Sequence, residues 1–184
     1  KIVTMVFPME HNKALLEKFW HKAARRIYKQ ICLGHNVAFV TIGDPFIYST
    51  YIYLIRKLRA IDPKIVIETV PGISAINAVA ALGQVPLAEY KEKIAIIPLP
   101  KQIKKLNLYF DLFDTVVLMK VGKFLNQLIS FLTQQGLEDS VFFASRIGCP
   151  GQYLAKGLKQ ITKEKSGYLS TMIIRINKTK KAQR

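Results

Sequence analysis

Short apolar runs rich in β-branched residues alternate with helix-forming segments along this chain, and the alternation is the strongest constraint on its fold. Apolar residues recur every three or four positions over residues 12–32, which predicts an amphipathic helix that ends before Gly34. The next run, residues 37–42, lies between two glycines and is typical of a buried strand. A helix at about residues 49–60 and a second strand at residues 65–67 follow. This order of elements predicts parallel βαβ units.

The second half of the chain repeats the pattern. After an alanine-rich helix at residues 74–82 the composition turns polar around residues 88–92, and we expect a boundary there between domains of residues 1–90 and 91–184. The elements expected beyond it are a strand at 94–97, an amphipathic segment at 101–111, a strand at 115–119, a helix at 123–135, and strands at 141–145 and 170–176. The predicted fold class is therefore α/β, with two consecutive α/β domains.

The composition indicates the class of protein but does not identify its binding partner. Half of the 184 residues are apolar and 22% are charged, which indicates a globular chain. The 28 lysines and arginines outnumber the 12 acidic residues and leave a net charge of +16, so a nucleic acid, an anionic membrane surface or a polyanionic small molecule are all open as partners. Cys32 and Cys149 lack the spacing of a zinc site, and no apolar run approaches the roughly 18 residues of a membrane helix. We expect a soluble, cytoplasmic protein.

The loop after the first predicted strand, residues 41–50, is the first candidate site. Ligands of open α/β sheets bind beyond the carboxyl ends of strands, and Gly43 would let one approach the backbone closely. Asp44 offers a carboxylate there, held extended by Pro45. Three hydroxyl side chains come next, at the start of a predicted helix, where free N–H groups collect: Tyr48, Ser49 and Thr50. An ordinary strand-to-helix turn explains the same residues equally well.

Two further loops follow predicted strands. Pro71 and Gly72 fit the centre of a type II turn, in which Gly72 needs a positive φ, and Ser74 suits a helix cap. Because this loop follows the next predicted strand, it and the Gly43 loop could be neighbours on one sheet edge. In the second half, Met119 ends a strand, and Gly148 lies in a glycine-rich loop that allows close backbone approach.

Several familiar motifs are missing from the sequence. It contains no GxGxxG after a strand, no GxxxxGK[ST], no HExxH and no GxSxG. Nicotinamide-dependent, nucleotide-triphosphate, zinc-hydrolase and serine-hydrolase activities all lose support, and we expect no metal site.

Three segments in order along the chain resemble the tetrapyrrole (corrin/porphyrin) methylases. They are GDPFIYST at residues 43–50, VPGISA at residues 70–75 and VVLMKVG at residues 116–122. Within that family, the VFPM segment at residues 6–9 and SRIG at residues 145–148 are similar to the precorrin-2 / cobalt-factor II C-20 methyltransferases of cobalamin biosynthesis. The resemblance runs over nearly the whole chain.

The resemblance implies a two-domain α/β protein that binds S-adenosylmethionine in the cleft between its domains and methylates a tetrapyrrole polycarboxylate, usually as a homodimer. The residues that it assigns to the cofactor are Ile42, Gly43, Asp44, Ile47, Ser49, Thr50, Ser74, Ala75, Met119 and Gly148, with Asp44 and Tyr48 as catalytic candidates. Family members open with a strand and a GxGPGD-like loop, and this sequence begins downstream of where that loop belongs. We therefore expect the first strand and loop of the N-terminal domain to be absent.

Three alternatives stay open at the level of sequence. One is a methylase of the same family that acts at another ring position or on a uroporphyrinogen or diphthine substrate. Another is a basic RNA-binding module, which the charge favours, although the strands lack the paired aromatic residues of such modules. The third is a catalytically silent remnant that only dimerises.

Overall fold

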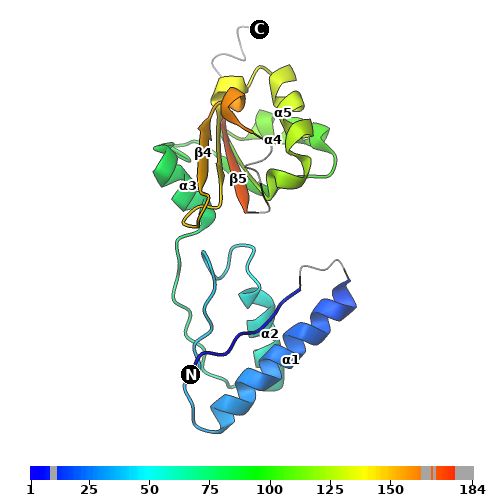
Figure 1. Ribbon diagram of the computed structural model, residues 1–184, viewed down its shortest axis with the longest axis vertical. Helices are drawn as coiled ribbons and strands as arrows, with labels where there is room; N and C mark the ends of the chain where they lie inside the picture. Colours follow the sequence, from blue (N-terminus) through cyan, green and yellow to red (C-terminus); the bar gives the residue numbers. More distant parts are fainter. Residues whose placement is uncertain (9–11, 163–166, 168, 177–184) are drawn as a thin grey trace. The chain divides into compact units, whose positions relative to one another are not determined.

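The computed structural model describes residues 1–8, 12–162, 167 and 169–176. The chain divides into two compact units, Lys1–Ser74 and Ala75–Arg184, which we call the N-terminal unit and the C-terminal unit (Figure 1). The α/β class predicted for the chain is confirmed. Across the part of the chain that is described, no helix has both the length and the apolar character needed to cross a bilayer.

Two packed helices form the core of the N-terminal unit. Helix α1, Lys13–Cys32, begins where the Asn12 side chain accepts a hydrogen bond from the Leu15 amide at 3.1 Å. Helix α2, Tyr51–Ile61, lies against it, and the two share a small apolar core. The buried residues of that core are Ala23, Ala24, Ile27, Leu54 and Leu58. Trp20 also stacks on Tyr53, with ring centroids 4.1 Å apart.

The strands predicted at residues 37–42 and 65–67 are wrong. Partly buried and exposed residues alternate over residues 38–42 and 65–70, but neither segment is a strand of a sheet. The alternation is a local property of the sequence, whereas a strand also needs a partner to which its backbone can hydrogen-bond. Among the described residues, no backbone hydrogen bond joins the two segments.

A five-stranded sheet forms the centre of the C-terminal unit, in the order β1-β2-β5-β3-β4. The strands are β1, Ile94–Pro98; β2, Thr115–Met119; β3, Val141–Ser145; β4, Tyr153–Lys156; and β5, Ser170–Arg175. β1 and β2 are parallel, and the remaining neighbours are antiparallel. Four of these strands were predicted from the sequence, while the short edge strand β4 was not.

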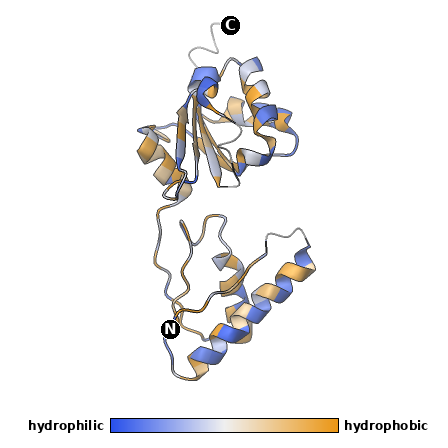
Figure 2. Cartoon of the chain, viewed as in Figure 1, coloured by the Kyte–Doolittle hydropathy of each residue, from blue (hydrophilic) through white to orange (hydrophobic). Residues whose placement is uncertain are grey.

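Helices cover both faces of this sheet. Helix α3, Ala75–Gly83, packs Ile76 and Val79 against Val117, Phe142 and Ile173 on one face. Helices α4, Leu106–Leu112, and α5, Leu125–Gln134, cover the other face (Figure 1). Short 3-10 helices complete the unit at Ile103–Lys105, Val121–Phe124, Glu138–Ser140 and Leu158–Gln160. Figure 2 shows apolar residues along these strands and on α3, as expected for a sheet buried on two sides.

Arg175 holds the connection between α3 and β1 on the sheet. Its guanidinium donates two hydrogen bonds to the Glu92 carboxylate, at 2.8 and 3.0 Å, and others to Thr115 Oγ1 at 3.0 Å and the Leu87 carbonyl at 3.5 Å. Residues 75–93 therefore pack with the C-terminal unit. The compact units divide between residues 74 and 75, whereas the expected domain limits, 1–90 and 91–184, stay a prediction.

Candidate cofactor site

The Asp44 carboxylate joins two loops of the N-terminal unit. Its Oδ1 accepts a hydrogen bond from the Phe46 amide at 2.8 Å, within its own loop. Its Oδ2 accepts one from the Gly72 amide at 3.3 Å, although Gly72 lies 28 positions further along the chain. The two loops are neighbours, as expected, but they do not lie on a sheet edge, because the segments that precede them form no sheet.

Glycine is required in both loops, for different reasons. Gly43 has a φ of +79°, a conformation that residues with a Cβ seldom adopt. Gly72 is absent from the residues of positive φ, so the type II turn predicted there is wrong. A Cβ on Gly72 would lie 2.3 Å from the Gly43 carbonyl oxygen. Gly72 is thus needed for the close approach of the two backbones.

The hydroxyl groups at the start of α2 have unequal roles. Ser49 is buried, and its Oγ lies 3.3 Å from Thr41 Oγ1 and accepts a hydrogen bond from the Tyr51 amide at 3.2 Å. Thr50 occupies the N-cap position of α2 in a helical conformation, and its side chain makes no cap bond. Ser49 therefore fixes the loop to the helix, while its buried side chain leaves little room for contact with a ligand.

The apolar side chains of the first loop are exposed. Ile42 is 86% exposed and Ile47 is 38% exposed. Tyr48 is 47% exposed and has a φ of +54°, which costs a residue with a side chain on the order of 1–3 kcal/mol. Ser74, at the end of the second loop, is buried. This surface combines apolar groups, one aromatic ring and a carboxylate next to exposed backbone.

The other predicted cofactor residues lie in the C-terminal unit. Met119 ends β2, and its sulfur accepts a hydrogen bond from Thr171 Oγ1 at 3.7 Å. Gly148 follows β3 with a φ of +72°, and its amide donates to Gln152 Oε1 at 2.9 Å. Because β2 and β3 both run antiparallel to β5, Met119 and the Gly148 loop lie at the same edge of the sheet. Ala75 is the exposed first residue of α3.

The predicted residues thus form two sets, one in each unit. The N-terminal unit holds Ile42, Gly43, Asp44, Ile47, Tyr48, Ser49, Thr50 and Ser74, and the C-terminal unit holds Ala75, Met119 and Gly148. Within the first set, the Asp44 carboxylate makes one surface of the two loops.

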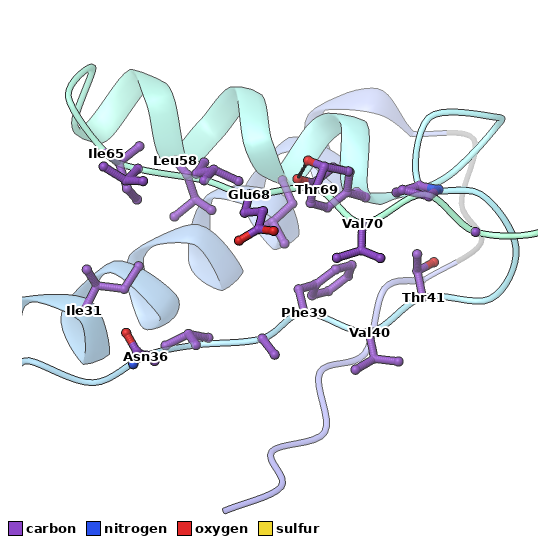
Figure 3. Close-up of a pocket in the computed structure, with 18 of the residues that line it drawn as sticks. Ile31, Asn36, Phe39, Val40, Thr41, Leu58, Ile65, Glu68, Thr69 and Val70 are labelled. Carbon is purple, nitrogen blue, oxygen red and sulfur yellow. Dashed lines mark hydrogen bonds between the residues drawn. The ribbon is translucent and has the colours of Figure 1, made fainter.

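Sequence reasoning missed a pair of hydroxyl groups that support the first set. Thr69 Oγ1 lies 2.5 Å from the Tyr51 hydroxyl, and so connects the second extended segment to α2. Thr41 makes the corresponding contact with Ser49 from the first segment. Both threonines line the pocket in Figure 3 and are partly buried, as are Phe39 and Ile67 two positions before them, so the period of two within each segment was the signal that pointed to them.

Two groups with shifted pKa values lie outside these loops. The Arg175 guanidinium, with the Glu89 amide, lowers the pKa of Glu92 below its ordinary value of 4.5. Tyr28 has a raised pKa, first because of its hydrogen bond with Cys32 and then because of the negative charge of Asp62. The described residues contain no cluster of three or more histidine, cysteine or acidic side chains suited to a metal ion.

Comparison with known proteins identifies related sequences and folds. Residues 2–160 match the family described as tetrapyrrole (corrin/porphyrin) methylases. A probable cobalt-precorrin-2 C(20)-methyltransferase of Methanocaldococcus jannaschii is 39% identical over 131 residues, which are 71% of this chain and 53% of that protein. The cobalt-precorrin-2 C(20)-methyltransferase of Salmonella typhimurium is 27% identical over 169 residues, 91% of this chain and 70% of that protein.

Among solved structures, the uroporphyrin-III C-methyl transferase of Thermus thermophilus, complexed with S-adenyl homocysteine, shares the fold. Its TM-score is 0.55 at 17% identity, with 86% of this chain and 72% of that chain covered. The chain spans about half the length of the M. jannaschii relative.

Proposed function

The chain belongs to the tetrapyrrole (corrin/porphyrin) methylases, and on that premise we propose that it acts in S-adenosylmethionine-dependent methylation of precorrin-2 or cobalt-factor II at C-20, in cobalamin biosynthesis. The observation that carries the proposal is the hydrogen bond of Asp44 to Gly72, which joins the GDP and VPG loops into one surface. The 39% identity to a probable cobalt-precorrin-2 C(20)-methyltransferase supports the choice of substrate.

The residues of the N-terminal unit fit S-adenosylmethionine. Exposed Ile42 offers apolar surface to a flat ring, and the close approach of Gly72 to Gly43 holds the two loop backbones together beside it. A carboxylate and an aromatic ring, those of Asp44 and Tyr48, can stabilise a sulfonium charge. In the C-terminal unit we assign Ala75, Met119 and Gly148 to the same cofactor.

The chemistry requires alignment more than proton transfer. When bound, the cofactor supplies a methyl group that its sulfonium already makes electrophilic. The protein must therefore hold donor and acceptor in line, which accounts for the absence of a catalytic triad or paired carboxylates from the proposed site. In this scheme Asp44 holds the two loops in register and faces the ligands, and Tyr48 presents its ring.

The net charge of +16 supports a substrate that carries several carboxylates, because a basic surface raises the local concentration of a polyanion. By family resemblance, we also assign the protein to the cytoplasm as a homodimer. Sedimentation of the purified chain tests the dimer, and a mass equal to one chain at every concentration would exclude it.

Mass spectrometry of the tetrapyrrole after incubation with S-adenosylmethionine tests reaction and substrate together. We expect a mass increase of one methyl group, placed at C-20 by analysis of the product, with precorrin-2 supplied either with or without cobalt. Methylation at another ring position would replace the proposal by a different activity of the same family. Failure of S-adenosylhomocysteine to bind, measured by calorimetry, would favour a silent remnant.

Substitution of Asp44 tests its role, and we expect Asp44→Ala to reduce turnover at least a hundredfold while the chain stays folded. Asp44→Asn is the matched variant, because the amide oxygen can still accept one backbone hydrogen bond while the negative charge is lost. If both variants lose activity equally, the charge is needed; if Asp44→Asn retains most of it, Asp44 acts as a positioning residue. Wild-type turnover in Asp44→Ala would remove Asp44 from the site.

Tyr48→Phe separates the hydroxyl from the ring of that side chain. We expect the variant to keep most of its turnover, since the proposed role of Tyr48 is an aromatic face toward a sulfonium. Loss of turnover, measured by the same mass spectrometric assay, would assign the role to the hydroxyl instead.

A further inference from the structure

The connections that follow β1, β2 and β3 in the C-terminal unit are strongly basic. They span residues 99–105, 120–124 and 146–152, which the structure describes in full, and they contain no acidic residue. β1 and β2 are parallel, and β2 and β3 both run antiparallel to β5, so the three connections lie at the same edge of the sheet. We call this the basic edge, and its charged residues are Lys101, Lys104, Lys105, Lys120, Lys123 and Arg146.

The acidic residues of the same unit gather toward the opposite edge. Each acidic residue that the structure describes there stands one to five positions before the start of β1, β2 or β3: Glu89, Glu92, Asp111, Asp114, Glu138 and Asp139. Basic residues occur at that edge too, as in the ion pair of Arg175 with Glu92. One edge therefore carries mixed charge, whereas the basic edge carries positive charge alone. The field of such an edge attracts a ligand with several negative groups.

Lys120 and Arg146 occupy corresponding positions on the basic edge. Each directly follows a strand, β2 or β3, and each has a positive φ, +59° and +53°. Residues with a side chain seldom adopt this conformation, and they keep it only where the surrounding structure imposes it. The Lys120 amide donates to the Ser170 carbonyl at 2.9 Å, and the Arg146 amide donates to the Leu169 carbonyl at 2.8 Å. Both backbones are therefore fixed at the end of β5 that lies between them.

The left-handed residue breaks the alternation of each strand. Met119 packs on the α3 face of the sheet, so a period of two would place the next residue on the other face, where Val121 is buried instead. Ala144 also packs on the α3 face, and the place two positions later is taken by Ile147. In both strands an apolar residue fills the core in place of the base. Lys120 and Arg146 are left exposed at the edge.

The spacing of the two bases suits a large ligand with more than one carboxylate. β5 lies between β2 and β3, so the backbones of Lys120 and Arg146 stand two inter-strand spacings apart, or about 10 Å. S-adenosylmethionine has a single carboxylate beside an amine and a sulfonium, which are both positive. A tetrapyrrole polycarboxylate instead carries acetate and propionate arms around its ring. The charge of the basic edge therefore favours the tetrapyrrole over the cofactor.

We propose that Lys120 and Arg146 bind two carboxylate arms of the tetrapyrrole substrate, one arm each, while the other bases of the basic edge attract it. The inference rests on the proposed function and names residues for its substrate. A guanidinium can hold a carboxylate through two parallel hydrogen bonds, and an ammonium acts as a point charge. Because Met119 precedes Lys120 and Gly148 lies two positions after Arg146, the arms would be held beside residues assigned to the cofactor.

Equilibrium dialysis of cobalt-factor II against the full 184-residue chain tests the proposal, and calorimetry measures S-adenosylhomocysteine binding on the same samples. We expect Lys120→Gln and Arg146→Gln each to weaken cobalt-factor II binding about tenfold, and the double variant about a hundredfold, because independent contacts add. Affinity for S-adenosylhomocysteine should be unchanged. Lys159→Gln is the charge control, because Lys159 follows β4, which runs antiparallel to β3 and ends at the opposite edge. It should leave both affinities unchanged.

Glycine substitution separates the base from the backbone conformation. Lys120→Gly removes the side chain and the strain together, so we expect the affinity loss of Lys120→Gln with a urea midpoint no lower than that of the wild type. Gln84→Gly is the control, because Gln84 has a φ of +50° and lies outside the basic edge. It should leave cobalt-factor II binding unchanged. Wild-type affinity in Lys120→Gly, or a joint loss of stability and affinity, would overturn the role of Lys120.

Three other results would overturn the inference. The first is unchanged cobalt-factor II affinity in Lys120→Gln and Arg146→Gln, or a double variant no weaker than either single one. The second is a loss of S-adenosylhomocysteine affinity alone, which would assign the two bases to the carboxylate of the cofactor. The third is equal weakening of poly(U) RNA binding, which would make the edge a general polyanion surface. In all three cases the proposed methyltransferase stands. It fails, and the inference with it, if the wild type neither binds S-adenosylhomocysteine nor methylates the tetrapyrrole.

Discussion

The two units of this protein contain the same kind of apolar run, but among the described residues only the runs of the C-terminal unit form a sheet. In the C-terminal unit, apolar β-branched runs become five paired strands with helices on both faces. In the described residues of the N-terminal unit, runs of the same kind form no strand, and Val40, Val66 and Val70 are exposed. Alternation therefore sets the conformation of a segment locally, whereas a sheet also requires a second strand whose backbone can hydrogen-bond to the first.

The completion of the C-terminal unit depends on α3, and removal of this helix should have the largest effect. Ile76 is 1% exposed and Val79 fully buried, so a fragment of residues 91–184 should lose about 3–6 kcal/mol relative to a fragment of residues 75–184, from these two side chains alone. Urea denaturation followed by circular dichroism measures the difference. Equal stability of the two fragments would instead support the domain boundary expected at residues 90 and 91.

Matched phenylalanine substitutions compare the cores of the two units directly. Phe143 is fully buried in the sheet, and Phe143→Ala should cost about 3–5 kcal/mol of unfolding free energy. Phe39 is only partly buried in the segment at residues 37–42, so Phe39→Ala should cost about 1 kcal/mol. Trp20, the single tryptophan, lies in the N-terminal unit, and its fluorescence should report Phe39→Ala and remain unchanged in Phe143→Ala. Equal costs would remove the contrast between the units.

The Arg175–Glu92 ion pair should give the C-terminal unit a small acid sensitivity. The pKa of Glu92 is lower in the folded chain than its ordinary value of 4.5, so its contribution to stability is complete above pH 4.5 and is lost as the pH falls through the folded pKa. Both side chains are about one third exposed, which keeps the effect modest.

Glu92→Gln should therefore lower the urea midpoint at pH 7 and make it less dependent on pH below 4.5. Glu89→Gln is the control, because no described ion pair involves Glu89. An identical pH profile for wild type and Glu92→Gln would show that the pair contributes nothing to stability.

Elements that depend on local pattern were predicted well. The helices at α1, α2, α3 and α5, and four strands of the sheet, follow from periods of 3.6 and 2 bounded by glycine or proline. β4 escaped prediction because Tyr153–Lys156 is short and lies at the edge of the sheet. The lack of pairing at residues 37–42 could not be predicted from the segment alone, because pairing depends on a second strand that is distant in the sequence.

The candidate site shows the same limit. The proximity of the Gly43 and Gly72 loops followed from their positions after successive apolar runs. The reason for glycine at position 72 did not, because a collision with the Gly43 carbonyl is visible only when the two loops are placed together. Likewise Ser49 reads as a ligand-facing hydroxyl in the sequence, and its burial against Thr41 became evident only in the fold.

The Asp44 carboxylate accepts hydrogen bonds from backbone amides of two loops, and this couples the motions of the two loops. While the Asp44 oxygens hold both Phe46 and Gly72, motion of either loop strains a hydrogen bond to the other. A molecule that orders the GDP loop therefore also removes part of the entropy that the VPG loop has left to lose, and a second ligand on the VPG loop binds at a smaller entropic cost. Positive cooperativity between two ligands can arise from this link with no change in the average backbone.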